Sequence, residues 1–133
     1  MRSWSDDHNQ SKERRREKTL TIFLATTPYG YQNTQTALKL AEAALDGGHR
    51  VTIFASADGV HNFTTGQGPQ AVPNAEEGFS RLIGRGLRVE LCGSCLKFRG
   101  VGREDVLEGA APSSLKTLFG LLGETDAFLS LGA

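Results

Sequence analysis

The chain has 133 residues, 38% of them hydrophobic, and Lys+Arg and Asp+Glu number 15 each, so its formal net charge is zero. This length suits one domain, and the balance of charges argues against a nucleic-acid binder. The sequence has no apolar run long enough to cross a bilayer and begins with a polar segment, so we expect neither a membrane helix nor a signal peptide. The two cysteines, Cys92 and Cys95, are too few for a disulfide-stapled secreted scaffold, which favours a cytoplasmic location.

Residues 1–18 differ in composition from the rest of the chain. They contain six basic and four acidic residues, and their only large apolar residues are Met1 and Trp4. Such a segment buries too little apolar surface to offset the entropy lost on ordering, so we predict a disordered charged tail. Residues 19–133 are then expected to form the single folded domain.

The first half of this domain predicts two strands and a helix. The apolar, β-prone runs at 20–25 and 51–57 indicate buried strands. Between them, residues 33–46 show helical spacing of apolar side chains, with Asn33 or Thr34 as the predicted cap and two glycines as the stop.

The second half continues the alternation. In chain order the patterns predict a polar loop at 58–74, a helix at 75–84, a strand at 87–91, a short helix at 103–109 and a last strand at 127–131. A further helix runs from Ser113 or Ser114 to about residue 122. Its predicted inward side chains are Leu115, Leu118, Phe119 and Leu122.

Strands thus alternate with helices, and no two-residue hairpin signal joins adjacent strands. This alternation is typical of βαβ units, which build parallel sheets with helices on both faces. With right-handed crossovers, the prediction is an α/β fold, a flavodoxin-like three-layer sandwich with a mainly parallel sheet.

The thiol pair follows directly on a predicted strand, at the edge of the sheet where α/β proteins place reactive groups. If a helical turn begins at Gly93 or Ser94, the Cys92 sulfur faces its N-terminus, which would lower the thiol pKa and favour the nucleophilic thiolate. Lys97 and Arg99 lie nearby in sequence and add positive charge. The alternative is a pair of small, partly buried hydrophobic side chains.

The other candidate residues lie in the loops after the first two strands. The loop 26–34 contains neither a G-x-G-x-x-G nor a G-x-x-x-x-G-K motif, so we predict no nucleotide cofactor. Asp58 is interpreted as a loop residue or helix cap, and His61 as an acid/base or orienting group or an ordinary surface histidine. We predict no metal, because C-x-x-C supplies only two of the four ligands that zinc needs.

The chain from about Lys18 to Ala133 resembles the DsrE/TusD, or DsrE/DsrF-like, family of sulfur-relay proteins. Three stretches carry the resemblance, one after each of the first three strands. They are Pro28-Tyr29-Gly30, then Asp58-Gly59-Val60 with Asn62, and finally Cys92 seven residues ahead of Arg99, followed by Gly100-Val101.

The resemblance implies a parallel α/β sandwich whose cysteine at the Cys92 position receives sulfane sulfur as a persulfide and hands it on. It also implies sulfur donor and acceptor proteins as partners, and assembly as a homo-oligomer or as a hetero-oligomer with related subunits. The two loops after the first strands would line the pocket. Candidate pocket residues are therefore Tyr29, Gly30, Asp58, His61 and Arg99.

Cys95 is where the chain departs from a simple sulfur carrier, which needs no second thiol three residues on. A second thiol could resolve the persulfide, releasing hydrosulfide and forming a Cys92–Cys95 disulfide. Two alternatives to sulfur transfer therefore stay open. One is thiol–disulfide redox work by the pair, and the other is a non-catalytic subunit of an oligomer.

Overall fold

The computed structural model describes residues 17–132, so most of the predicted charged tail, residues 1–18, lies outside the described residues. The strands are β1 (Thr19–Leu24), β2 (Arg50–Ala55), β3 (Arg88–Cys92), β4 (Ala110–Ser113) and β5 (Ala127–Leu131). The α-helices are α2 (Asn33–Asp46), α3 (Ala75–Gly84), α4 (Gly93–Phe98) and α5 (Leu115–Glu124). Two 3-10 helices are η1 (Ala57–Phe63) and η2 (Arg103–Asp105). None of these helices is long and apolar enough to cross a membrane.

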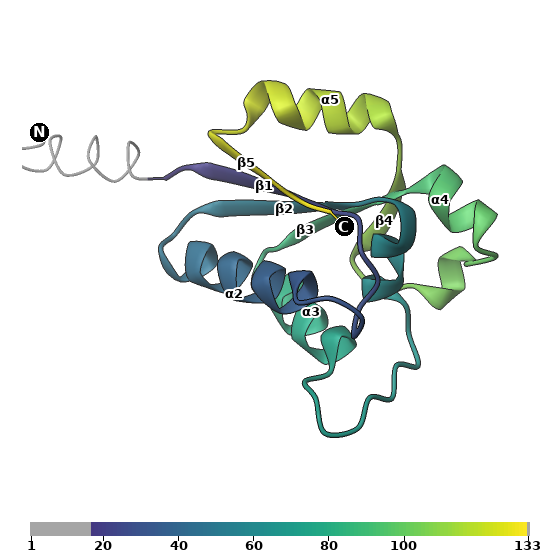
Figure 1. The fold of residues 1–133 in the computed structure, drawn as a ribbon. Helices are drawn as coiled ribbons and strands as arrows, with labels where there is room; N and C mark the ends of the chain where they lie inside the picture. The colour runs from purple at the N-terminus through teal and green to yellow at the C-terminus, as the bar shows by residue number, and fades with distance from the viewer. Residues whose placement is uncertain (1–16, 133) are drawn as a thin grey trace, which may run out of the picture.

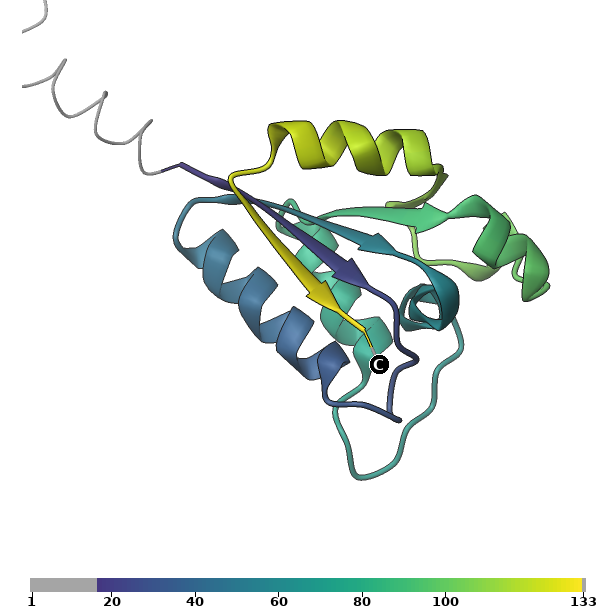
Figure 2. The same ribbon diagram turned by 45° about the horizontal axis from the view of Figure 1, so that its top comes forward.

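The five strands form one sheet in the order β4-β3-β2-β1-β5, and every neighbouring pair is parallel. Helices α2 and α3 cover one face of the sheet, and α5 covers the other (Figure 1). This arrangement confirms the predicted α/β sandwich of three layers. Because all strands run the same way, their carboxyl ends meet at one edge, where η1 and α4 also lie (Figure 2).

The main core lies between the sheet and helices α2 and α3. Alternate strand residues point into it, so Ile22 in β1, Ile53 in β2 and Leu91 in β3 are fully buried. The rings of Phe63 in η1 and Phe79 in α3 pack against each other at a centroid distance of 4.5 Å, tilted by 44°, within the same core. The 3-10 helix η1 is therefore packed into the body of the domain.

A smaller core lies on the opposite face of the sheet, beneath α5. It consists of Phe54, Leu118, Leu121 and Cys92, with Phe23 packed against it. Cys92 thus belongs to the α5 side of the sheet by strand alternation, because Val89 and Leu91 face the other way.

Two predicted elements were wrong. The first part of the polar loop predicted at 58–74 is instead the 3-10 helix η1, which is stabilised by buried hydrogen bonds of Asn62. The helix predicted at 103–109 is only the short turn η2, and the chain then enters β4. The four residues of β4, Ala-Ala-Pro-Ser, lack the β-branched and aromatic side chains that indicate a strand. Parallel pairing with β3 holds them in the sheet, and β4 is an edge strand, where Pro112 is tolerated.

Helix α5 has the predicted cap but a different inward face. The Ser114 hydroxyl accepts a hydrogen bond from the Thr117 N–H, as expected of an N-cap. Leu118 and Leu121 face the sheet, whereas Leu115, Phe119 and Leu122 are exposed. The predicted stripe was therefore wrong in part, because a helix with apolar residues on two sides does not reveal which side its sheet covers.

Helix α2 has the predicted bounds but lacks the predicted side-chain cap. Its N-cap residue is Gln32, which makes no capping hydrogen bond with its side chain. The Asn33 side chain instead donates to the Thr26 hydroxyl and to the Gly132 carbonyl, both at 3.1 Å. Asn33 therefore joins the loop after β1 to the residue that follows β5.

Candidate functional site

A hollow of about 540 Å³ opens at the carboxyl edge of the sheet, near the ends of three strands. Ser56 follows β2, Cys92 ends β3 and Ser113 ends β4. The hollow is lined by Ser56, Cys92, Gly93, Ser94, Cys95, Ser113, Ser114, Leu115 and Lys116. Both thiols therefore share one hydroxyl-rich depression, with a lysine at its border.

Cys92 is the last residue of β3 and directly precedes α4. Its side chain is only 9% exposed, and burial raises its thiol pKa, as does its hydrogen bond with Cys95. The N–H groups of Ser94 and Cys95 do face the sulfur, as the sequence predicted, and act to lower the pKa. The predicted lowering was nevertheless wrong, because removal from water outweighs these two donors.

For Cys95 the influences on the thiol pKa balance the other way. Burial acts to raise its pKa, but several groups that favour the thiolate outweigh it, so the pKa of Cys95 is lowered. These groups are the Cys92 thiol, the Ala57 N–H at 3.1 Å from the Cys95 sulfur, the Ser56 hydroxyl at 3.6 Å, and the positive charge of Arg99. Cys95 is therefore the more acidic of the two thiols.

The backbone at Ala57 is held in a left-handed conformation, with φ of 51°, which is costly for a residue other than glycine. This conformation accompanies the N–H that donates to the Cys95 sulfur. Gly59 fixes η1 next to it, since a Cβ at Gly59 would lie 2.0 Å from the Leu24 carbonyl oxygen. The close packing of η1 against the end of β1 thus fixes the position of the Ala57 N–H.

Asp58 and Arg99 form an ion pair behind Cys95. The Arg99 Nε donates to Asp58 Oδ1 at 2.9 Å, and its Nη1 donates to the Cys95 carbonyl oxygen at 3.2 Å. Arg99 therefore joins η1 to α4 and holds its charge near the Cys95 sulfur. The structure brings these two predicted residues to the thiol pair, although neither lines the hollow itself.

Tyr29, Gly30 and His61 lie away from the lining of this hollow. Tyr29 borders two other hollows together with Val72, and its hydroxyl accepts the Ala75 N–H at 3.0 Å. Gly30 lies in the exposed turn beside it, and His61 is part of η1, where its carbonyl accepts from the Thr64 hydroxyl. The structure therefore places these three predicted pocket residues in the segments after β1 and β2, outside the lining of the thiol hollow.

Sequence reasoning missed Ser56, Ser113 and Lys116 as lining residues. Ser56 directly follows a predicted strand, which was the available signal for it. Ser113 and Lys116 had no such signal, because β4 was not predicted. The unpredicted edge strand is therefore what completes the far wall of the hollow.

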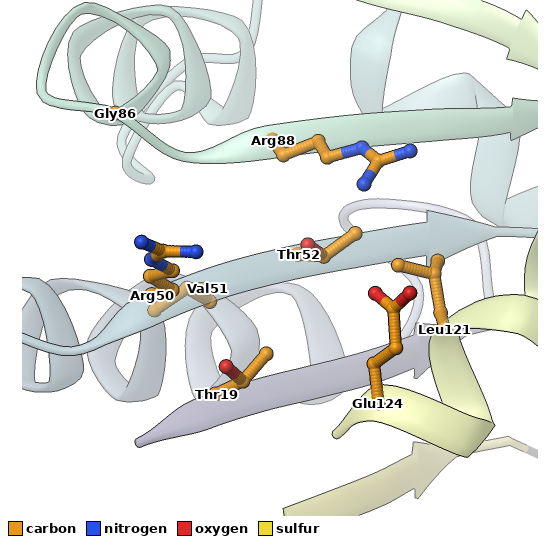
Figure 3. A pocket seen from close by; sticks show the side chains of 8 residues that line it. All are labelled: Thr19, Arg50, Val51, Thr52, Gly86, Arg88, Leu121 and Glu124. Atoms are coloured by element: carbon orange, nitrogen blue, oxygen red, sulfur yellow. The ribbon is translucent and has the colours of Figure 1, made fainter. Parts of the chain in front are cut away.

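A second hollow, of about 270 Å³, lies at the amino edge of the sheet, on the side of α5 (Figure 3). The two arginines that line it are already paired, Arg50 with Glu17 at 2.7 Å and Arg88 with Glu90 at 2.7 Å. Its lining residues are Thr19, Arg50, Val51, Thr52, Gly86, Arg88, Leu121 and Glu124. No cysteine or histidine lines it, so the thiol hollow is the stronger candidate for chemistry.

Metal binding finds little support at the thiol pair. Within residues 17–132, no group of three or more His, Cys, Asp or Glu side chains lies close enough together to hold an ion. The two sulfur atoms alone would leave a tetrahedral metal half coordinated.

The fold and the site together define a three-layer α/β domain with a two-cysteine site at the carboxyl edge of its parallel sheet. The chain belongs to the DsrE/DsrF-like family, whose model matches residues 18–131. It is 37% identical over 107 residues to the uncharacterized protein MK0008 of Methanopyrus kandleri, a match covering 80% of this chain and 88% of that protein. It is 36% identical over 106 residues to the uncharacterized protein MJ0989 of Methanocaldococcus jannaschii, covering 80% and 93%.

Solved structures share the fold at lower sequence identity. The YchN protein of E. coli superposes with a TM-score of 0.76 at 22% identity, covering 86% of this chain and 99% of that chain. The protein MTH1491 of Methanobacterium thermoautotrophicum superposes with a TM-score of 0.69 at 18% identity, covering 86% and 100%. These likenesses confirm the predicted α/β fold and cover at least 99% of each solved chain.

Proposed function

We propose that this protein is a cytoplasmic sulfur-relay carrier, in which Cys92 receives sulfane sulfur as a persulfide and passes it to an acceptor protein. The observation that carries this proposal is the position of Cys92 at the end of β3, in a hollow that it shares with the more acidic thiol of Cys95. Membership of the DsrE/DsrF-like family supports a role related to sulfur relay.

Loading of Cys92 needs a thiolate, and Cys95 supplies the base for it. The Cys95 thiolate takes the proton of the Cys92 thiol, which lines the same hollow. The Cys92 thiolate then attacks the outer sulfur of a donor persulfide, the donor S–S bond breaks, and the donor leaves as a thiolate. No electrons are gained or lost overall, and attack by an acceptor thiolate on the outer sulfur of the Cys92 persulfide repeats the exchange in the forward direction.

The lining of the hollow suits the product of this reaction. The outer sulfur of a persulfide is anionic or a hydrogen-bond acceptor, and it would extend from Cys92 into the hollow. The hydroxyls of Ser94, Ser113 and Ser114 are donors there, and Lys116 adds a positive charge. The same surface would receive a donor or acceptor protein.

Intact mass spectrometry tests this proposal. The reduced protein is incubated with inorganic polysulfide, and we expect the mass of one added sulfur atom. Cys92→Ser should not gain this sulfur, whereas Cys95→Ser should still gain it, more slowly because the base is lost. A Cys92→Ser variant that loads as fast as the unmodified protein would contradict the assignment of Cys92.

Thiol–disulfide redox work is the second candidate, favoured by the contact between the two thiols. A measured potential of the pair near that of thioredoxin, about −270 mV, together with no sulfur gained from polysulfide, would make redox work the better assignment. A thiol pair of ordinary reactivity that neither loads nor oxidises would instead favour a non-catalytic subunit.

We also propose that the protein assembles with a second copy or with a related subunit through α5. Leu115, Phe119 and Leu122 recur at helical spacing on its outer side and are 58%, 69% and 38% exposed. Such an apolar stripe is typical of an interface. Leu115 also lines the thiol hollow, so this interface would lie beside the reacting sulfur atoms.

A further inference from the structure

We propose that Cys95 resolves the Cys92 persulfide, so that the protein releases hydrosulfide when no acceptor takes the sulfur. This inference rests on the proposed function and adds a second fate for the loaded sulfur. It assigns Cys95 as a catalytic residue, and Ala57, Arg99 and Asp58 as the groups that position and stabilise its thiolate.

The first support is the geometry of the pair. Cys92 ends β3 and Cys95 lies in the first turn of α4, so the strand–helix junction places the two cysteines three residues apart at one edge of the sheet. Both are free thiols, and both line the same hollow. A thiolate at Cys95 is therefore within reach of the sulfur atom that carries the persulfide.

The second support is the set of groups around Cys95, which come from a different part of the chain. The Ala57 N–H donates to the sulfur at 3.1 Å from a strained backbone conformation. Arg99 lies behind it, fixed on one side by Asp58 at 2.9 Å and on the other by the Cys95 carbonyl. A structural cysteine needs no such groups, whereas an attacking thiolate does.

The reaction balances without an external oxidant. The Cys95 thiolate attacks the Cys92 Sγ, a Cys92–Cys95 S–S bond forms, and the bond from Cys92 Sγ to the outer sulfur breaks. The proton that Cys95 took from Cys92 during loading passes to the outer sulfur, which leaves with the electron pair of the broken bond as hydrosulfide. The two cysteines are oxidised to a disulfide, the sulfane sulfur is reduced, and a dithiol reductant must then restore the pair.

This chemistry makes the outcome depend on the occupant of the hollow. An acceptor thiol bound there attacks the outer sulfur and leaves the two cysteines reduced. In an empty hollow, Cys95 attacks the inner sulfur, which is Cys92 Sγ, and the outer sulfur is expelled as hydrosulfide. We therefore expect the protein to release sulfide in the absence of an acceptor.

The experiment follows one sulfur atom on the full chain. Reduced protein is loaded with inorganic polysulfide, excess reagent is removed by gel filtration without oxygen, and intact mass and free sulfide are recorded over time. We expect the added sulfur to be replaced by a loss of two hydrogens, with one sulfide released per disulfide formed. In Cys95→Ser the added sulfur should persist, with release slower by at least about tenfold.

Two variants separate the possible failures. Lys97→Gln is the matched control, because this lysine is exposed on α4 and makes no side-chain hydrogen bond to either thiol, and it should release sulfide like the unmodified chain. A chain that loads but keeps its sulfur as long as Cys95→Ser does overturns the resolving role alone. A chain that never loads, or that loads equally well as Cys92→Ser, overturns the proposed function instead.

Discussion

Two cysteines three positions apart lie in different electrostatic surroundings. Cys92 belongs to the small apolar cluster beneath α5, and removal from water favours its neutral form. Cys95 meets a backbone N–H, a hydroxyl and an arginine, all of which favour its charged form. The surroundings therefore favour a thiolate at Cys95 over one at Cys92.

Removing the charge of Arg99 should make Cys95 less reactive. In Arg99→Gln the pKa of Cys95 rises, because a positive charge that favoured the thiolate is lost. The alkylation rate of Cys95, followed against pH by peptide mass mapping, should have a lower midpoint in the unmodified chain than in the variant.

Lys97→Gln again provides the control, since it removes a positive charge from the same helix without touching the thiols. It should leave the midpoint unchanged. An equal shift in both variants would mean that the general charge of α4, and not the position of Arg99, sets the pKa of Cys95.

The local part of this site could be predicted from the sequence, and the distant part could not. The C-x-x-C spacing and the preceding strand were enough to place both cysteines at the carboxyl edge of the sheet. The greater acidity of Cys95 depends on Ala57, which is 38 residues away in the chain and contributes only a backbone N–H. No side-chain pattern reveals such a donor.

At the scale of elements, η1 is the segment on which the site depends, and Asn62 fixes it. This side chain is fully buried, accepts the Thr34 hydroxyl and donates to the carbonyls of Thr26 and Gly59 at 2.9 and 2.8 Å. One residue thus ties η1 to the loop after β1 and to α2. The segment is ordered by long-range hydrogen bonds, which explains why its polar sequence suggested a loop.

Asn62→Ala should destabilise the fold. It leaves a buried hydroxyl and two buried carbonyls without their partner, at a cost of roughly 2–3 kcal/mol in the free energy of unfolding. Urea denaturation measures this change.

Asn74→Ala is the comparison, because Asn74 caps α3 by accepting the Glu77 N–H and otherwise donates a long hydrogen bond of 3.4 Å to the Gln67 carbonyl, so its loss should cost about 1 kcal/mol. Equal losses in the two variants would contradict the special role of the buried amide.

Regular elements were predictable where the signals were local. The bounds of α2 and α3 follow from apolar periodicity and from the residues that stop each helix. The edge strand β4 has no such pattern, because its place depends on pairing with β3 over only four residues. Its absence from the prediction also removed Ser113 from the predicted site.

At the scale of the whole molecule, α5 is the element that a single chain leaves incompletely covered. Its inner side packs Leu118 and Leu121 on the sheet, and its outer side exposes a second apolar stripe. A sequence pattern alone could not separate the two sides, because both have helical spacing.

Phe119→Glu should reduce assembly, because a charge in the middle of the exposed stripe would have to be buried without a partner. We expect sedimentation analysis to give a smaller species for this variant than for the unmodified chain at the same concentration. Val72→Glu, which alters an apolar side chain that is 54% exposed in the loop before α3 and lies outside the α5 stripe, should leave the sedimentation unchanged. A monomeric unmodified chain at all concentrations would contradict the assembly.

The proline in β4 restricts how copies of this chain can join. Pro112 sits in an edge strand of four residues and offers no N–H to a neighbouring strand. Two copies therefore gain little by extending the sheet across this edge, and strand-to-strand aggregation is discouraged on the side where the thiols open to solvent. The side of the thiol hollow that β4 forms therefore stays accessible to a donor or acceptor protein, whichever way the copies associate through their helices.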